Sequence, residues 1–190
     1  HKYGGVVPGV GWVLWRGQDD LPEELRFNVN YLGGQMPTIG MNFSRPGAQI
    51  VAQYFNFIHL GHEGYCQRMN TLEKTATYLA ESIEMMGPMK LLSHPKGQLP
   101  VFAVTLDDSI DKWSVFQLSD HLRMRGWQVP AYTMPADCED IAVLRFVIRA
   151  GFTRDMGELL LQDIRNAIAW FEKLDTPMPD PNPDHQSFHH

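Results

Sequence analysis

The chain has 190 residues, 44% of them hydrophobic, and a formal net charge of -6. This length allows one large domain or two small ones. Because the chain is acidic and has no run of Lys and Arg, neither nucleic acid nor an anionic membrane is expected as a partner.

The sequence favours a soluble protein of a reducing, cytoplasmic compartment. No apolar run approaches the ~20 residues that span a bilayer, and no basic-then-apolar leader begins the chain. Cys66 and Cys138 are far apart and form no CxxC pair, so no disulfide framework is expected. We interpret both as small buried or half-buried thiols.

The first part of the chain predicts a turn, a strand and a long loop. Lys2 lies in a glycine-containing turn, and residues 10–15 form a short apolar run that is typical of a buried strand. Residues 19–38 are polar, aromatic and glycine-rich, which predicts a protruding loop or hairpin able to reach a neighbouring subunit.

Two helices are predicted next. Ser44 can cap a helix over residues 48–60, with Pro46 in its first turn, and such a helix N-terminus is an anion site. A second helix, over residues 63–86, ends at Gly87 and Pro88. We interpret this second helix as a bridge between two domains.

The rest of the chain alternates strands and helices, which predicts an α+β or α/β domain. After residues 89–92, to which no element is assigned, apolar stretches typical of strands cover residues 101–106, 128–133 and 142–148, and helical patterns cover residues 115–125 and 156–174. The last residues contain four prolines between positions 176 and 184 and predict a mobile tail.

A lysine near the start could carry chemistry. An amine that forms a Schiff base must be neutral part of the time, which burial or nearby positive charge achieves. His1 and the glycines after Tyr3 would place the Lys2 amine in a tight, partly polar site. Taken alone this signal is weak, because a lysine near a chain end is usually solvated.

Five stretches resemble glutamate decarboxylases of the bacterial and plant type, which depend on pyridoxal phosphate. They read HKYG at 1–4, GWV at 11–13, FNVNYLGGQ at 27–35, NFSRP at 42–46 and RGWQVPA at 125–131. The likeness continues in order and with similar spacing to about residue 171. The His-Lys pair is typical of pyridoxal-phosphate decarboxylases in general, whereas the third and fourth stretches resemble the decarboxylases that act on glutamate.

This resemblance implies the C-terminal part of a fold-type I pyridoxal-phosphate-dependent transferase, an α/β fold. Residues 1–73 would end the large cofactor-binding domain, residues 74–175 would form the small α+β domain, and residues 176–190 a flexible tail. The family also implies a homodimer, or a higher oligomer, whose active site is shared between subunits. Because a motif begins at once and the first residue is not Met, we expect the chain to be a fragment.

The resemblance assigns roles near the cofactor, pyridoxal 5'-phosphate. Lys2 would form the Schiff base with His1 beside it, and Phe43 and Ser44 would bind the cofactor. Ser44 would use its hydroxyl and amide on the phosphate of the other subunit, or serve as a plain helix cap. Tyr31 would close over the partner's active site and help deliver a proton, or be an exposed loop aromatic.

Arg145 lies in an apolar strand, where an unpaired guanidinium is costly and an anionic partner is expected. The resemblance implies that it binds a substrate carboxylate; a structural salt bridge is the alternative. His190 resembles a regulatory near-terminal histidine that plugs the site at neutral pH in some bacterial members. The ending here departs from that pattern, which favours a disordered tail or a tag remnant. His59 and His62 lack an evident third ligand, so no metal is expected.

The activity implied for the full-length chain is α-decarboxylation of L-glutamate to 4-aminobutanoate and carbon dioxide. It consumes one proton per turnover, which suits acid resistance. The 190 residues alone are expected to be inactive, because other cofactor-binding groups lie upstream of the lysine in the family. A related decarboxylase with another substrate, or a non-catalytic dimerisation remnant, are the alternatives. Calmodulin is not expected, since the tail is acidic and proline-rich.

Overall fold

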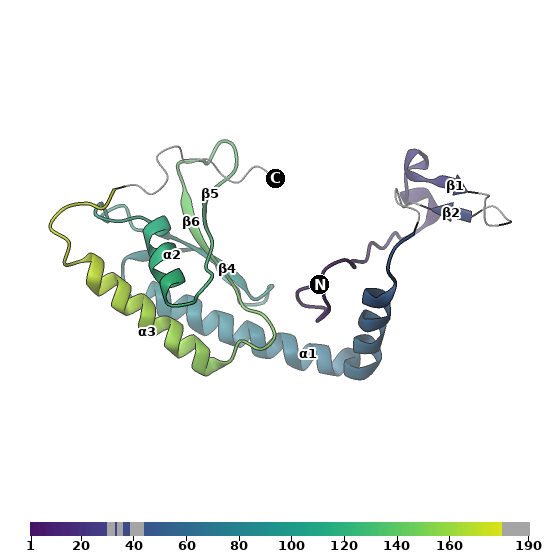
Figure 1. Cartoon of the computed structure of the whole chain (residues 1–190), viewed down its shortest axis with the longest axis horizontal. Coiled ribbons are helices and arrows are strands. Elements are labelled where there is room, and N and C mark those ends of the chain that lie inside the picture. The colour runs from purple at the N-terminus through teal and green to yellow at the C-terminus, as the bar shows by residue number, and fades with distance from the viewer. Residues whose placement is uncertain (30–32, 34–35, 39–43, 180–190) are drawn as a thin grey trace. The chain divides into compact units, whose positions relative to one another are not determined.

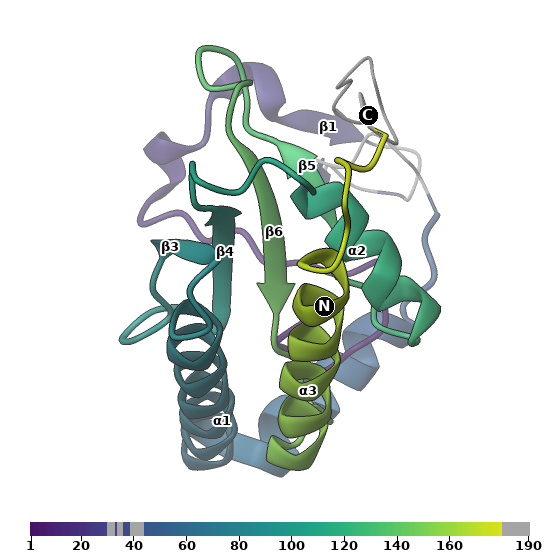
Figure 2. The same cartoon turned by 90° about the vertical axis from the view of Figure 1, so that its left-hand side faces the viewer.

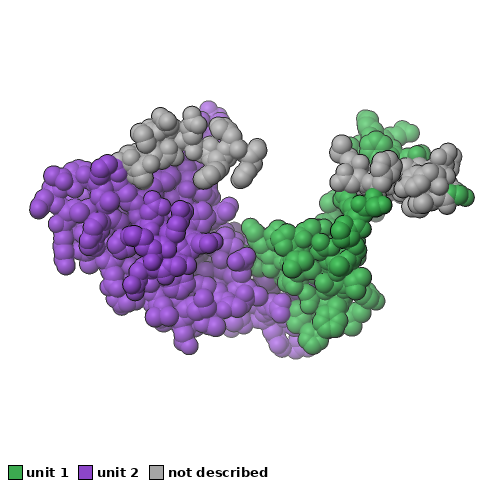
Figure 3. All heavy atoms as spheres, viewed as in Figure 1, with its two compact units in different colours: residues 1–62 green, residues 63–190 purple. Residues whose placement is uncertain are grey.

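The computed structural model describes residues 1–29, 33, 36–38 and 44–179. The chain divides into two compact units, residues 1–62 and residues 63–190, which Figure 3 shows in green and purple. We call them unit 1 and unit 2. The domain limits that the sequence suggests, after residues 73 and 175, stay a prediction.

In unit 1, the prediction of a buried strand over residues 10–15 is wrong. This segment is irregular, and Val13 and Leu14 are 68% and 91% exposed. The peptide groups of a buried strand must be paired with a neighbouring strand. No described segment pairs with residues 10–15, so an apolar composition alone does not make them a strand here.

The predicted hairpin of unit 1 is confirmed. Strands β1 (Phe27–Val29) and β2 (Met36–Thr38) pair antiparallel, with Phe27 opposite Thr38. Two short 3-10 turns, Gln18–Asp20 and Glu23–Leu25, precede them. The glycine-rich composition between residues 19 and 38 therefore marks a reversal of the chain, as expected.

Helix α1 (Ala48–Glu84) contains both predicted helices (Figure 1). Gly61 has φ 57° and ψ -173°, so the helical hydrogen-bond ladder is interrupted between the two parts. Glycine adopts this backbone without a steric penalty. At the other end, Gly87 has φ 98° and follows the last turn, which confirms it as the stop signal.

Unit 2 contains a four-stranded antiparallel sheet with the order β3-β4-β6-β5. Its strands are β3 (Met89–Ser93), β4 (Val101–Leu106), β5 (Ala131–Thr133) and β6 (Ala142–Val147). Strand β5 is shorter than predicted. Pro130 precedes it and has no N–H to donate to a ladder, although its carbonyl accepts a hydrogen bond from the Arg145 amide at 3.0 Å.

Two helices of unit 2, α2 (Val115–Met124) and α3 (Arg154–Phe171), lie side by side on one face of the sheet (Figures 1 and 2). Helix α3 begins two residues earlier than predicted because Thr153 caps it, accepting a hydrogen bond from the Met156 amide at 3.2 Å. The second half of α1 packs against α3: a Cβ added to Gly157 would lie 3.3 Å from Leu79 Cδ2.

The hydrophobic core of unit 2 lies between these helices and the sheet. In β4, Phe102 and Val104 are fully buried while their neighbours are half-buried, so one face of the strand points inward. Phe102 stacks on Phe146 across β4 and β6, with ring centroids 4.8 Å apart. Other fully buried side chains are Leu79, Ile83, Leu118, Leu122, Leu144, Leu161, Ile164 and Phe171.

Cys66 and Cys138 are both exposed, so their interpretation as buried or half-buried thiols is wrong. Cys66 lies on α1, and Cys138 lies in the connection between β5 and β6. Small apolar side chains are buried only where another element covers them, and the described elements cover neither position. Among the described residues, no helix is long and apolar enough to cross a membrane.

Candidate active site

The turn that carries Lys2 is held by α1. Gln53 Nε2 donates to the Gly4 carbonyl at 3.0 Å, and Asn56 Nδ2 donates to the Gly5 carbonyl at 2.8 Å. Gln53 and Asn56 are three residues apart and therefore share one face of the helix. Gln53 is only 3% exposed, and its bond to Gly4 is partly buried. The backbone immediately after Lys2 is thus fixed by two side chains of α1.

Gly4 is required by this contact. A Cβ at position 4 would lie 2.7 Å from Gln53 Oε1, closer than Cβ atoms approach other non-bonded atoms. Gln53 cannot move aside without breaking its hydrogen bond to the same residue. The close approach of the turn to α1 therefore depends on the missing side chain.

Lys2 and His1 are themselves exposed. A lysine that condenses with an aldehyde needs a reachable primary amine on a backbone that does not move. The turn supplies both features. The residues present therefore fit the lysine end of a pyridoxal-phosphate site.

Ser44 is exposed and precedes α1, but it is not the helix cap that the sequence suggests. The amides of Ile50 and Val51 both donate to the Gly47 carbonyl, so the helix begins after Gly47. The reason is Pro46, which disfavours helical backbone at the residue before it. Tyr31, Phe43 and His190 lie outside the described residues.

Arg145 belongs to unit 2 and is exposed, between buried Leu144 and Phe146 in β6. Alternation along the strand places its side chain on the sheet face opposite theirs. Its guanidinium lies 5.4 Å from the ring centroid of Tyr132. No carboxylate of the described residues pairs with it, so the alternative of a structural salt bridge does not occur among them.

A hollow of about 480 Å³ lies beside Arg145. Residues 126–129 form one wall, and a second arginine, Arg149, lines the hollow with Arg145. The wall is fixed by Asp163 of α3, which accepts from Arg125 Nε at 3.1 Å and from Trp127 Nε1 at 2.8 Å. Sequence reasoning missed Arg149; its alternation with Arg145 along an extended segment was the available signal.

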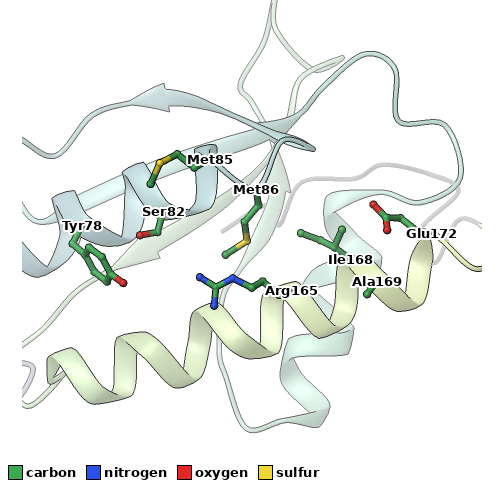
Figure 4. Close-up of a pocket in the computed structure, with 8 residues that line it drawn as sticks. All are labelled: Tyr78, Ser82, Met85, Met86, Arg165, Ile168, Ala169 and Glu172. Carbon is green, nitrogen blue, oxygen red and sulfur yellow. The ribbon is translucent and has the colours of Figure 1, made fainter.

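A second hollow, of about 560 Å³, lies between α1 and α3 and includes none of the predicted site residues. Figure 4 shows Arg165 extending from α3 toward Ser82 of α1 and toward Met86, which follows the end of α1. Nearby, Tyr78 donates to Glu158 at 2.6 Å and Arg154 covers the Tyr78 ring. The hydrogen bond from Tyr78 lowers the pKa of Glu158, and Arg154 acts in the same direction.

The chain is similar to known proteins over most of its length. It is 47% identical over 174 residues to a glutamate decarboxylase of Aliivibrio fischeri, and the matched region covers 91% of this chain and 38% of the relative. It is 49% identical over 179 residues to a glutamate decarboxylase of Solanum lycopersicum, and the matched region covers 94% of this chain and 35% of the relative. The chain thus spans little more than a third of these relatives.

The structure is similar to that of a glutamate decarboxylase from Lactobacillus brevis, with a TM-score of 0.82 and 42% identity. This match covers 92% of this chain and 40% of that one. The fold is therefore the predicted one, the C-terminal part of a fold-type I pyridoxal-phosphate-dependent enzyme. Residues 1–105 match the model of the pyridoxal-dependent decarboxylase conserved domain. Since this match includes more than half of the residues, the chain belongs to the pyridoxal-dependent decarboxylase family.

Proposed function

We propose that the chain is the C-terminal part of a pyridoxal-phosphate-dependent enzyme that converts L-glutamate to 4-aminobutanoate and carbon dioxide. The observation that carries this proposal is the exposed amine of Lys2 on a turn fixed by Gln53 and Asn56. Identity of 47–49% to glutamate decarboxylases supports the substrate. When bound, the cofactor supplies an electron sink for the charge left on the α-carbon as carbon dioxide departs.

Lys2 holds the cofactor aldehyde through its amine in this proposal. Because α1 restrains the carbonyls of Gly4 and Gly5, the backbone that carries this amine would stay in place during an exchange with the substrate amine. His1, which precedes Lys2 in the chain, is placed beside the cofactor in this proposal. Such positioning lowers the entropic cost of the exchange.

Arg145 binds a substrate carboxylate in this proposal. Its guanidinium is exposed and has no carboxylate partner among the described residues, so it is free to form a bidentate pair with a ligand. Ser44, before the N-terminus of α1, contributes to the phosphate site of the other subunit. Tyr31 and Phe43 at the cofactor and His190 as a regulator stay predictions.

We further propose a homodimer that shares its active sites. The first half of α1 supports this, because it exposes an apolar surface. Large exposed apolar patches mark protein interfaces. The residues of this surface are Ile50, Val51, Tyr54, Phe55 and Ile58, each more than half exposed.

The test uses the full-length protein loaded with pyridoxal phosphate. Borohydride reduction followed by peptide mass spectrometry is expected to place the cofactor on Lys2, and the enzyme is expected to release carbon dioxide from L-glutamate. Lys2→Ala removes both signals, whereas Lys96→Ala, at an exposed lysine of unit 2, removes neither. A cofactor adduct on another lysine overturns the proposal, and release from a different amino acid alone overturns its substrate.

A further inference from the structure

Arg145 and Arg149 project from the same face of one extended segment. Residues 144, 146 and 148 are buried, whereas residues 145 and 149 are exposed. The Ile148 amide donates to the Pro100 carbonyl at 3.0 Å, so the strand-like pairing continues past the end of β6. The alternation therefore extends through residue 149 and places both side chains on the same side of the segment, and both residues line the 480 Å³ hollow.

The hollow has positive charge that the described residues do not neutralise. Its described lining residues include both arginines and no Asp or Glu. Asp163, which holds the adjacent wall, is already bound by Arg125 and Trp127. Among the described residues neither Arg145 nor Arg149 has an ion pair. Two uncompensated guanidinium groups beside one hollow favour an anion there.

The remaining lining suits a short hydrocarbon chain between anionic ends. Val129 is buried, and the rings of Trp127 and Phe152 lie with their centroids 6.3 Å apart along the hollow. By strand rise, the Cα atoms of Arg145 and Arg149 lie about 13 Å apart, and long arginine side chains can shorten the gap between their guanidinium groups. Two guanidinium groups with apolar side chains beside them match the chemistry of a small aliphatic dicarboxylate.

We propose that Arg149 is a second carboxylate-binding residue, which acts with Arg145 to select a substrate that has two carboxylates over one that has a single carboxylate. This inference rests on the proposed function, because it names a specificity determinant of the same reaction. Arg149 takes part in no covalent step of the reaction. Its guanidinium attracts and orients the substrate dianion.

The test measures ligand binding and turnover separately in the full-length, cofactor-loaded enzyme. Calorimetry gives the Kd of glutarate, a dicarboxylate that cannot react, and of butyrate, which lacks one carboxylate. Arg149→Gln is expected to raise the Kd of glutarate, and the KM of L-glutamate, by about tenfold or more. The Kd of butyrate and kcat should change by less than about threefold.

Two variants control the interpretation. Arg149→Lys keeps the charge but loses the planar fork, so it should recover part of the glutarate affinity. Arg123→Gln removes an arginine of α2 that pairs with Asp120 and does not line the hollow, and should bind glutarate as the unaltered enzyme does. Unchanged circular dichroism and Tm in Arg149→Gln would confirm that the variant is folded.

The inference is overturned if Arg149→Gln binds glutarate with unaltered affinity. It is also overturned if the Kd values of glutarate and butyrate rise by the same factor, which is the pattern of a structural role. It is separable from the proposed function. Failure of the unaltered enzyme to decarboxylate L-glutamate would refute that function, whereas the ratio of the two Kd values still decides the role of Arg149.

Discussion

Unit 1 and unit 2 bury their hydrophobic residues very differently. Among the described residues, every buried hydrophobic side chain lies at position 72 or later, within unit 2. Unit 1 instead exposes large apolar side chains, such as Leu14 at 91% and Val51 at 68%. Unit 2 therefore has a core of its own, whereas the apolar surface of unit 1 is available for contact with other polypeptide. The two units should respond differently to the same kind of mutation.

The sharpest test of this contrast truncates one large side chain in each unit. Phe102→Ala removes a fully buried ring stacked on Phe146 and should lower the free energy of unfolding by about 3–5 kcal/mol. Leu14→Ala removes a side chain that the described residues leave exposed and should change it by less than about 0.5 kcal/mol, whereas a larger loss would indicate that other polypeptide covers Leu14. Urea unfolding of the full-length protein measures both, and equal losses would break the comparison.

The next test concerns the Lys2 turn. Gly4→Ala places a Cβ against Gln53, so either the turn moves or Gln53 shifts and loses its bond to the turn, and we expect the decarboxylation rate of the full-length enzyme to fall by about tenfold to a hundredfold. Gly11→Ala is the matched control, because a Cβ there meets nothing within 4 Å. Equal rates for the two variants would show that the fixed turn is not needed.

A smaller effect is expected at the wall of the hollow in unit 2. Asp163 is 13% exposed and accepts from both Arg125 and Trp127. Asp163→Ala should therefore lower the free energy of unfolding by about 1.5–3 kcal/mol. Asp120→Ala, which breaks an exposed pair with Arg123, should cost less than about 1 kcal/mol. Chemical unfolding of both variants side by side decides whether the wall is held as inferred.

The smallest effect concerns pH. Hydrogen bonds from Lys90, at 2.7 Å, and from Ser109 lower the pKa of Asp107 well below its usual value. A lowered folded-state pKa stabilises the protein above the unfolded-state pKa, about 3.9, and this contribution is lost as the pH falls toward the folded-state value. Asp107→Asn should therefore shift the urea midpoint at pH 7 slightly, and less at pH 3. A shift that grows on acidification would contradict this sign.

Sequence patterns predicted most of the secondary structure because they depend on local chemistry. Gly61 and Gly87 interrupt and end the helices where the sequence suggests, since glycine tolerates backbone that other residues avoid. The apolar stretches at residues 101–106 and 142–148 became strands β4 and β6. Residues 10–15 did not become a strand, because a strand also needs a neighbour, which local composition cannot supply.

The sequence by itself determined the family, the lysine that we assign to the cofactor, and the order of helices and strands. Motifs, glycines and hydrophobic periodicity are local features, so they can be recognised without the tertiary structure. Only the tertiary structure decided that Gln53 and Asn56 hold the Lys2 turn and that Arg149 joins Arg145 beside one hollow. Gln53 and Asn56 contact residues about fifty positions away in the chain. Such contacts arise from packing and hydrogen bonding between distant segments, which no local pattern encodes.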